Sequence, residues 1–208
     1  MIEASVGGPV SRLAGQGDGR VSHELLHDVR FWEHLLRIDE DLCATARKAG
    51  CPDCGGRLDR ADFPRKPRGG PAELPEGYER RLSLCCDRCR KRVTPASVRF
   101  LGRRVYLAAV MVLVSVMRSG PTPGKVARLE ELFGVDRRTV KRWRRWWLEA
   151  FVVTPFWRAK RARLMPPVDE AELPASLLAR FCGELEERLC LLLEFLSPLT
   201  TASAGSRW

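Results

Sequence analysis

Four of the eight cysteines stand at spacings that suit a metal ion. Cys51 and Cys54 form one C-x-x-C pair, Cys86 and Cys89 form a second, and 31 residues separate the two pairs. Two such pairs are typical of a zinc ribbon, in which each pair makes a tight turn and four thiolates surround one Zn²⁺ at about 2.3 Å. Because this ligand set is closed and leaves no position for a substrate, we expect one structural zinc ion.

The segment "LCCDRC" leaves one ligand open, because Cys85 could replace Cys86 in a C-x3-C pair. We prefer Cys86, since a two-residue spacer closes the tighter turn. The alternatives to a metal are cysteines that pack as small hydrophobes, or a redox role for one pair, although no βαβ pattern surrounds either pair. The remaining cysteines, Cys43, Cys182 and Cys190, fall on predicted helices, where we expect buried thiols.

A second segment with functional character is "DRRTVKRWRRWW" at 136–147, which combines six cationic side chains with three tryptophans. A buried helix could not hold the cations, and a fully solvated helix would not need the tryptophans. At 100° per residue, one stripe contains Val140, Trp143, Trp147, Ala150 and Phe151, and the opposite side contains Arg138, Lys141, Arg142 and Arg145. The segregation predicts a helix anchored by its aromatic side, with its basic side facing a polyanion.

The twenty residues "VARLEELFGVDRRTVKRWRR" fit a helix-turn-helix when Gly134 lies in the turn and Asp136 caps the second helix. One departure is Glu130, at the close approach of the two helices, where Ala or Gly is usual. We predict a recognition helix at 137–151 whose DNA contacts come from Arg137, Arg138, Lys141, Arg142 and Arg145. A solvated basic face, a calmodulin-like partner and a membrane surface are the alternatives.

The charge distribution supports a polyanionic partner. The net charge is +10, and the stretches 57–104 and 136–163 each carry a balance of +8, whereas both ends of the chain are mildly acidic. The N-terminus shows no export signal, so eight cysteines indicate thiols or metal ligands rather than disulfides. The longest apolar run, "VYLAAVMVLVSVM", is shorter than the roughly 20 residues that span a bilayer. We therefore expect a cytoplasmic, nucleoid-associated protein with no membrane partner.

These motifs require a fold that is mostly α-helical, with a small β zinc ribbon, a three-helix helix-turn-helix module and flanking helices. In the ribbon, the Pro/Gly-rich loop "PRKPRGGPAELPEG" connects two short strands near 57–63 and 78–84. Further helices are expected at 103–118 and 123–133. The predicted organisation is a disordered N-terminus at 1–21, a helix at 22–50, the four-cysteine zinc ribbon at 51–94, the helix-turn-helix domain at 100–155, a basic linker at 156–173 and a C-terminal amphipathic helix at 174–199.

The C-terminal helix carries a seam of apolar residues with a 4-3-4-3-4 rhythm, formed by Leu178, Cys182, Leu185, Leu189, Leu192 and Leu196. Such a seam is typical of a coiled coil and would allow a homodimer, in which paired recognition helices read half-sites one turn apart. Packing against the chain's own helices is the equal alternative.

The order of zinc ribbon, connecting helices and helix-turn-helix resembles the N-terminal DNA-binding region of bacterial insertion-sequence transposases. The motifs "CPDCGG", "CDRC" and "GVDRRTVKRWRRWW" carry this resemblance over about residues 51–151. In that family an RNase H-like nuclease domain with an acidic triad follows. Fewer than sixty residues remain here, without the strands of that domain, so the resemblance implies DNA binding and no catalysis.

The sequence contains neither a G-x-S-x-G motif nor a Gly-rich phosphate loop, and we expect neither enzymatic activity nor a small-molecule substrate. The leading hypothesis is a sequence-specific double-stranded-DNA-binding protein, either a transcriptional regulator or the DNA-binding accessory of a mobile element. An adaptor that binds another protein and a truncated, inactive transposase are the alternatives.

Overall fold

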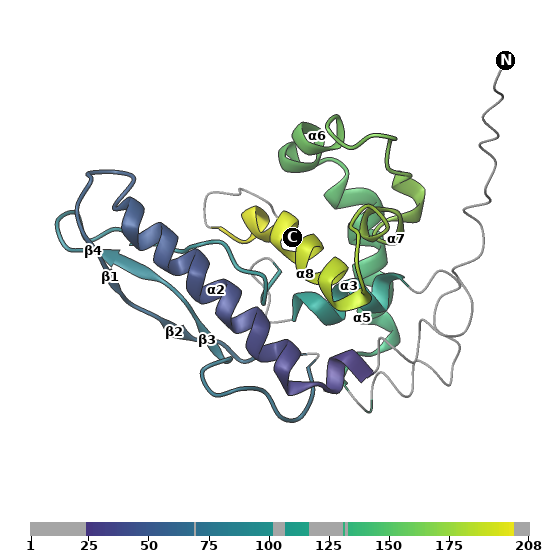
Figure 1. Ribbon diagram of the computed structural model, residues 1–208, viewed down its shortest axis with the longest axis horizontal. Coiled ribbons are helices and arrows are strands. Elements are labelled where there is room, and N and C mark those ends of the chain that lie inside the picture. Colours follow the sequence, from purple (N-terminus) through teal and green to yellow (C-terminus); the bar gives the residue numbers. More distant parts are fainter. Residues whose placement is uncertain (1–23, 69, 102–106, 117–130, 132, 202–208) are drawn as a thin grey trace, which may run out of the picture.

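The computed structural model describes residues 24–68, 70–101, 107–116, 131 and 133–201. Within these ranges about half of the chain is helical, less than the mostly α-helical fold that the sequence predicts, and a small antiparallel sheet is present, as expected (Figure 1). The predicted disorder at 1–21 lies outside the described residues, as does nearly all of the expected first helix of the helix-turn-helix at 123–133.

The longest helix, α2, covers Val29–Ala49 and begins later than expected. Residues 24–27 form a separate helical turn, and the Asp28 carboxylate accepts a hydrogen bond from the Arg30 backbone N–H at 3.0 Å to start α2. Gly50 ends the helix with φ of 78°, as predicted. The buried face of α2 includes Trp32, Leu35, Asp39 and Cys43.

Residues 51–94, which we call the cysteine module, lie along α2 (Figure 1). Its strands form one three-stranded sheet of order β1-β4-β5 and one two-stranded sheet, all antiparallel. A small apolar cluster made by Leu58, Leu82 and Leu84 packs against Cys43 of α2. The bounds are Leu58–Arg60 for β1, Phe63–Pro64 for β2, Arg80–Arg81 for β3, Leu84–Cys86 for β4 and Arg92–Val93 for β5.

In the described part of residues 107–201, which we call the helical region, α5 and α8 pack against α3, whose side chains are nearly all buried. Two of its helices have clear caps, because Asp136 starts α5 and Thr154 starts α6. The helices are α3 at Ala108–Val116, α5 at Arg137–Arg145 with a π-helical continuation at Trp146–Phe151, α6 at Pro155–Arg161, α7 at Ala175–Leu178 and α8 at Leu185–Leu196, with 3-10 turns at Glu170–Glu172 and Ser197–Thr200.

An aromatic cluster forms part of the core of the helical region. The ring of Phe151 lies 5.0 Å from that of Trp147 and 5.0 Å from that of Trp157, and all three are fully buried. The Trp157 indole N–H donates to the Glu170 carboxylate at 2.7 Å. The predicted basic linker at 156–173 is therefore wrong, because its first residues form α6 and insert a tryptophan into the core.

The predicted continuous helix at the C-terminus is also wrong. The chain leaves the helical path between α7 and α8, and Gly183 has φ of 103°, a conformation that side-chain-bearing residues rarely adopt. A capping box of Glu184 and Glu187 then starts α8. Because Cys182 lies in this break, its thiol is exposed rather than buried as expected, whereas Cys43 and Cys190 are buried.

Apart from Cys182, the apolar seam of the C-terminal segment packs against the chain's own core. Leu189, Leu192 and Leu196 are fully buried there, while Leu191 on the other side of α8 is 43% exposed. Of the two alternatives that the sequence left open, the described structure uses the seam for intramolecular packing.

Candidate metal centre and basic helix

Two tight turns at one end of the cysteine module present the four predicted cysteines. In the first, Cys51 N–H donates to Gly56 O at 2.9 Å and Gly55 N–H to Cys51 O at 2.8 Å. In the second, Cys86 N–H donates to Lys91 O at 3.0 Å and Arg90 N–H to Cys86 O at 3.2 Å. The residue after the second cysteine of each pair has positive φ, 67° at Gly55 and 60° at Arg90. The two turns therefore share one geometry, although only one contains glycine.

The four sulfur atoms converge. All lie within 4.8 Å of one another, and the Cys51–Cys89 and Cys54–Cys86 Sγ distances are 3.6 and 3.4 Å. A tetrahedral zinc site with Zn–S bonds of about 2.3 Å has S–S edges of about 3.8 Å, whereas a disulfide bond is about 2.05 Å long. The cluster thus has the dimensions of a metal site and not of two disulfides.

The structure separates Cys85 from this cluster. Cys85 lies on the other face of β4 from Cys86, as alternation along a strand requires, and its Sγ lies 3.6 Å from Arg90 O. The ambiguity in the sequence is resolved by the pleat, because only one of two adjacent strand residues can face the other pair.

Electrostatics within the cluster favour a bound cation. Hydrogen bonds from the backbone N–H groups of Cys89 and Arg88 lower the pKa of the Cys86 thiol to about 7. At Cys89 the Lys91 N–H acts in the same direction, but burial and the neighbouring sulfur atoms outweigh it and raise the pKa of that thiol to about 12. Four thiolates this close would repel one another, and a divalent cation removes that repulsion. The residues present therefore fit a metal ion.

The cations around the cluster are partly engaged with carboxylates. Lys91 donates to Asp53 at 2.7 Å, across the two turns, and Arg57 lies 3.2 Å from Asp59. The Lys91–Asp53 pair joins one cysteine turn to the other and stabilises their mutual position. Because both cations are exposed, the contribution of each pair to stability is small.

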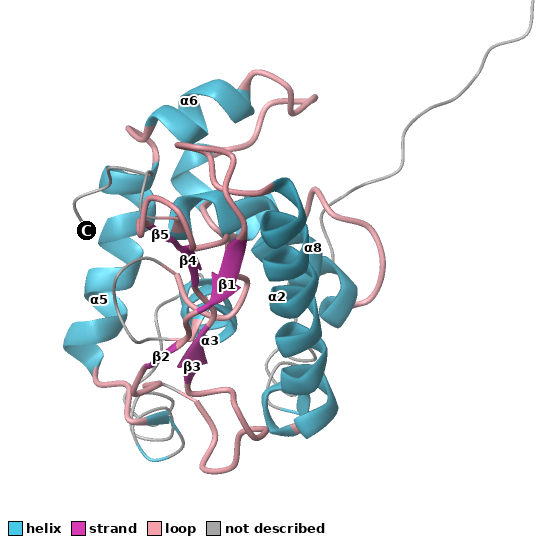
Figure 2. Ribbon diagram, turned by 90° about the vertical axis from the view of Figure 1, so that its left-hand side faces the viewer, coloured by secondary structure: helices cyan, strands magenta, loops and turns pink. Residues whose placement is uncertain are grey.

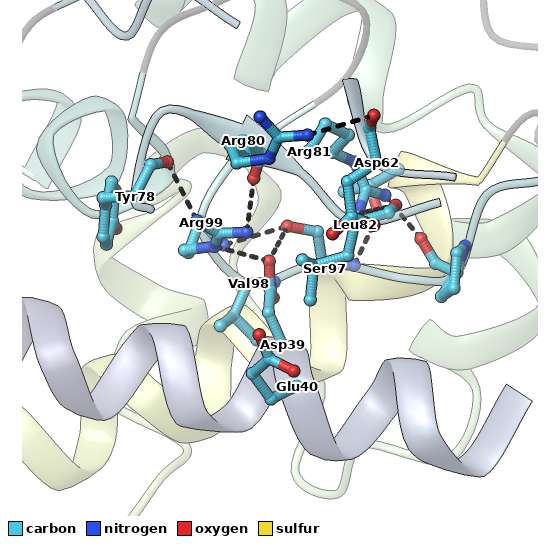
Figure 3. Close-up of polar contacts among 12 residues, drawn as sticks. Asp39, Glu40, Asp62, Tyr78, Arg80, Arg81, Leu82, Ser97, Val98 and Arg99 are labelled. Atoms are coloured by element: carbon cyan, nitrogen blue, oxygen red, sulfur yellow. Dashed lines mark hydrogen bonds and ion pairs between the residues drawn. The ribbon is translucent and has the colours of Figure 1, made fainter. Parts of the chain in front are cut away.

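A buried ion pair ties the cysteine module to α2 and to the segment that leads into α3. Arg99 donates to the Asp39 carboxylate at 2.7 Å, and both side chains are fully buried (Figure 3). The same guanidinium donates to the main-chain carbonyls of Tyr78 and Arg80 at 2.9 and 2.8 Å. Asp39 also accepts from the Ser97 hydroxyl and the Val98 N–H. Each nitrogen of the guanidinium and each oxygen of the carboxylate thus makes at least one hydrogen bond.

Sequence reasoning missed this pair. A signal was present, because Asp39 lies at helical spacing between Leu35 and Cys43, on the buried side of α2. An acidic residue on an apolar helix face predicts a buried partner. No sequence feature near Arg99 indicates that it is the partner of Asp39.

The second predicted site, on α5, has the expected segregation of side chains. Gly134 adopts φ of 61° in the turn, and the Asp136 carboxylate accepts from Thr139 N–H at 2.6 Å, which lowers the pKa of Asp136. Val140, Trp143, Trp147 and Phe151 are buried. We call the exposed cations Arg137, Arg138, Lys141 and Arg145 the basic face.

The structure departs from the prediction for this helix in two respects. Arg142 is half-buried, and its guanidinium lies 3.4 Å from the Thr139 hydroxyl, so it is less accessible than the basic face. The helix also widens into a π-helix at Trp146–Phe151, which brings Trp146 against Trp147 with ring centroids 4.8 Å apart. Glu130, predicted at the close approach of the two helices, lies outside the described residues.

Comparisons of the chain with protein-family models, with curated protein sequences and with solved structures find no match. Among the helices that the structure describes, none combines the length and the apolar character needed to cross a bilayer.

Proposed function

We propose that this chain is a sequence-specific double-stranded-DNA-binding protein. In this proposal, α5 and its π-helical continuation are the recognition helix of a helix-turn-helix, and the basic face contacts phosphates and base edges. A transcriptional regulator and the DNA-binding accessory of a mobile element would both use this interface.

The observation that carries the proposal is the division of one helix into two faces. Arg137, Arg138 and Lys141 are exposed in the first turns of α5, next to Gly134. Trp143 and Trp147 behind them are buried. In helix-turn-helix proteins the N-terminal residues of the recognition helix reach the bases. Arginine and lysine there match the acceptors of guanine and the charge of phosphate.

The cysteine module has a structural role in this proposal. Cys51, Cys54, Cys86 and Cys89 would hold one Zn²⁺ as a closed tetrahedral set, and the resulting zinc ribbon would be rigid. Leu189, Leu192 and Leu196 are part of the chain's own core, so a homodimer through this seam would have to uncover them. The proposal therefore does not depend on a homodimer through this seam.

Salt dependence of binding tests the proposal. Metal-replete protein is titrated with a random-sequence duplex at several salt concentrations, for wild type and for Arg138→Gln/Lys141→Gln. We expect steep salt dependence in wild type and a slope about 1.8 smaller in the variant, since each phosphate contact adds about 0.9 to the log–log slope.

A matched control is Arg158→Gln/Arg163→Gln, which removes the same charge from exposed positions in and after α6. This control should keep the wild-type slope. Absence of binding by wild type at low salt would exclude the proposed function.

A further inference from the structure

The Pro/Gly-rich insertion of the cysteine module reaches the turn that precedes α5. The described residues 65–68 and 70–74, which we call the basic loop, leave β2 and share a surface hollow with the helix-turn-helix segment. Pro67, Arg68 and Leu74 line this hollow on one side, and Phe133 and Gly134 line it on the other. Segments that are about 60 residues apart in the sequence thus lie side by side at the beginning of the basic helix.

The position of the basic loop is fixed by contacts along its length. At its start, the Arg65 N–H donates to Glu79 O at 2.6 Å. In its middle, Leu107 N–H donates to Arg68 O at 3.1 Å, and Gly70 packs so closely against Leu107 that a Cβ atom there would collide with the leucine side chain. Leu74 then packs against the main core. The described residues of the loop therefore hold a defined position on the surface beside α5.

Two cations of this loop are available to a ligand. Lys66 and Arg68 are exposed, and among the described residues neither side chain has a hydrogen bond or an ion pair. Arg65 differs, because its guanidinium lies 5.2 Å from the centroid of the Phe63 ring. Arg68 thus lies at the hollow beside Gly134, which precedes the end of α5 that carries Arg137 and Arg138, and Lys66 lies two residues before Arg68.

We propose that Lys66 and Arg68 contact the phosphate backbone of the same DNA duplex that α5 reads. This inference rests on the proposed function. The end of a recognition helix that enters the major groove lies between two phosphate strands, and duplex DNA carries one charge per about 1.7 Å of axis. Arg68, which lines the hollow with Gly134, and Lys66, two residues before it, would therefore lie near a phosphate strand when Arg137 and Arg138 reach the groove. The cysteine module positions these cations and so takes part in binding.

The test compares two variants that change the net charge equally. Lys66→Gln/Arg68→Gln removes the loop cations, and Arg158→Gln/Arg163→Gln removes two cations near α6, which lies away from β2 and β3 in both views (Figures 1 and 2). Affinity for a random-sequence duplex is measured against salt. We expect the loop variant to lower the log–log slope by about 1.8, and the α6 variant to leave it unchanged.

The measured slopes either support or contradict contact of the basic loop with DNA. An unchanged slope in the loop variant, with steep wild-type binding, overturns the role of the loop and leaves the proposed function intact. An equal fall in both variants also overturns it, because net charge alone would then explain the effect. Absence of binding by wild type removes the proposed function and this inference together.

The loop variant should fold as wild type does, since both side chains are exposed and the Arg68 contact with Leu107 uses the main chain. Metal content and thermal unfolding check this. The single variant Lys66→Gln, at a position outside the hollow, should lower the slope by about 0.9 and repeats the test with a smaller change.

Discussion

The cysteine module and the helical region differ in the number of apolar side chains that they bury. The apolar cluster of the module consists of Leu58, Leu82 and Leu84 with three cysteines, two of which belong to the candidate metal centre. The core of the helical region contains the fully buried rings of Trp147, Phe151 and Trp157 together with most of α3 and α8. For a region that buries so few apolar side chains, the proposed zinc ion would supply a cross-link, whereas the helical region can rely on burial.

The largest effect should come from breaking the cross-link, and the adjacent cysteines offer a matched pair. Cys86→Ser should abolish stoichiometric zinc binding and unfold the cysteine module, because structural zinc sites contribute on the order of 10 kcal/mol. Cys85→Ser should bind zinc as wild type does, since its sulfur faces away from the cluster. Metal analysis and circular dichroism measure both.

The same variant tests whether the helical region keeps its structure when the cysteine module unfolds. The helical signal of the Cys86→Ser variant should remain largely intact, because the aromatic core lies outside the module. Full zinc binding and unchanged folding in Cys86→Ser would show that the four cysteines are not a metal site.

The next effect concerns the junction between the two regions. Arg99→Met leaves the Asp39 carboxylate buried without its partner and should lower the free energy of unfolding by about 3–5 kcal/mol, measured by urea denaturation. The exposed control Arg57→Met should change it by less than about 0.5 kcal/mol. A loss at Arg99 no larger than at Arg57 would contradict a stabilising junction.

A second buried arginine near this junction shows how different the environment is. Burial lowers the pKa of Arg81 to about 10, and its guanidinium donates to the main-chain carbonyls of Leu82 and Pro95. Arg99 has a carboxylate partner at 2.7 Å, whereas the partners of the Arg81 guanidinium among the described residues are main-chain carbonyls. The ion pair is therefore the specific feature of Arg99.

The smallest effect is a pH dependence confined to the helical region. Hydrogen bonds from Trp157 and Arg161 lower the pKa of Glu170 below 4.5. Because the folded pKa is depressed, the stabilisation is present above pH 4.5 and is lost as the pH falls through the folded pKa. Its size should be below about 1 kcal/mol, since the side chain is 37% exposed and solvent screens the charge.

Glu170→Gln tests this dependence. Thermal unfolding should show the variant less stable than wild type near neutral pH and the difference shrinking in acid. Zinc binding by the cysteine module should be equal in both proteins. A stability difference that is constant from neutral pH to below about pH 4 would contradict the role of the charged carboxylate.

Local features of this protein follow from the sequence. The spacing of Cys51 and Cys54, the glycine in the turn at 134, the cap at Asp136 and the two faces of α5 depend on residues within a few positions of one another. Turn geometry, capping and helical periodicity act over that range, so a single sequence contains them. The break before α8 is also a local feature, because Gly183 permits the positive φ that interrupts the helix.

Only the tertiary structure decided the rest. The choice between Cys85 and Cys86 depended on which face of β4 meets the other pair, and the burial of Leu189 depended on the presence of a core to receive it. Asp39 and Arg99 are 60 positions apart, and the basic loop meets Gly134 across a similar distance. Such contacts arise from the packing of separate elements, and no periodicity or spacing within one element specifies them.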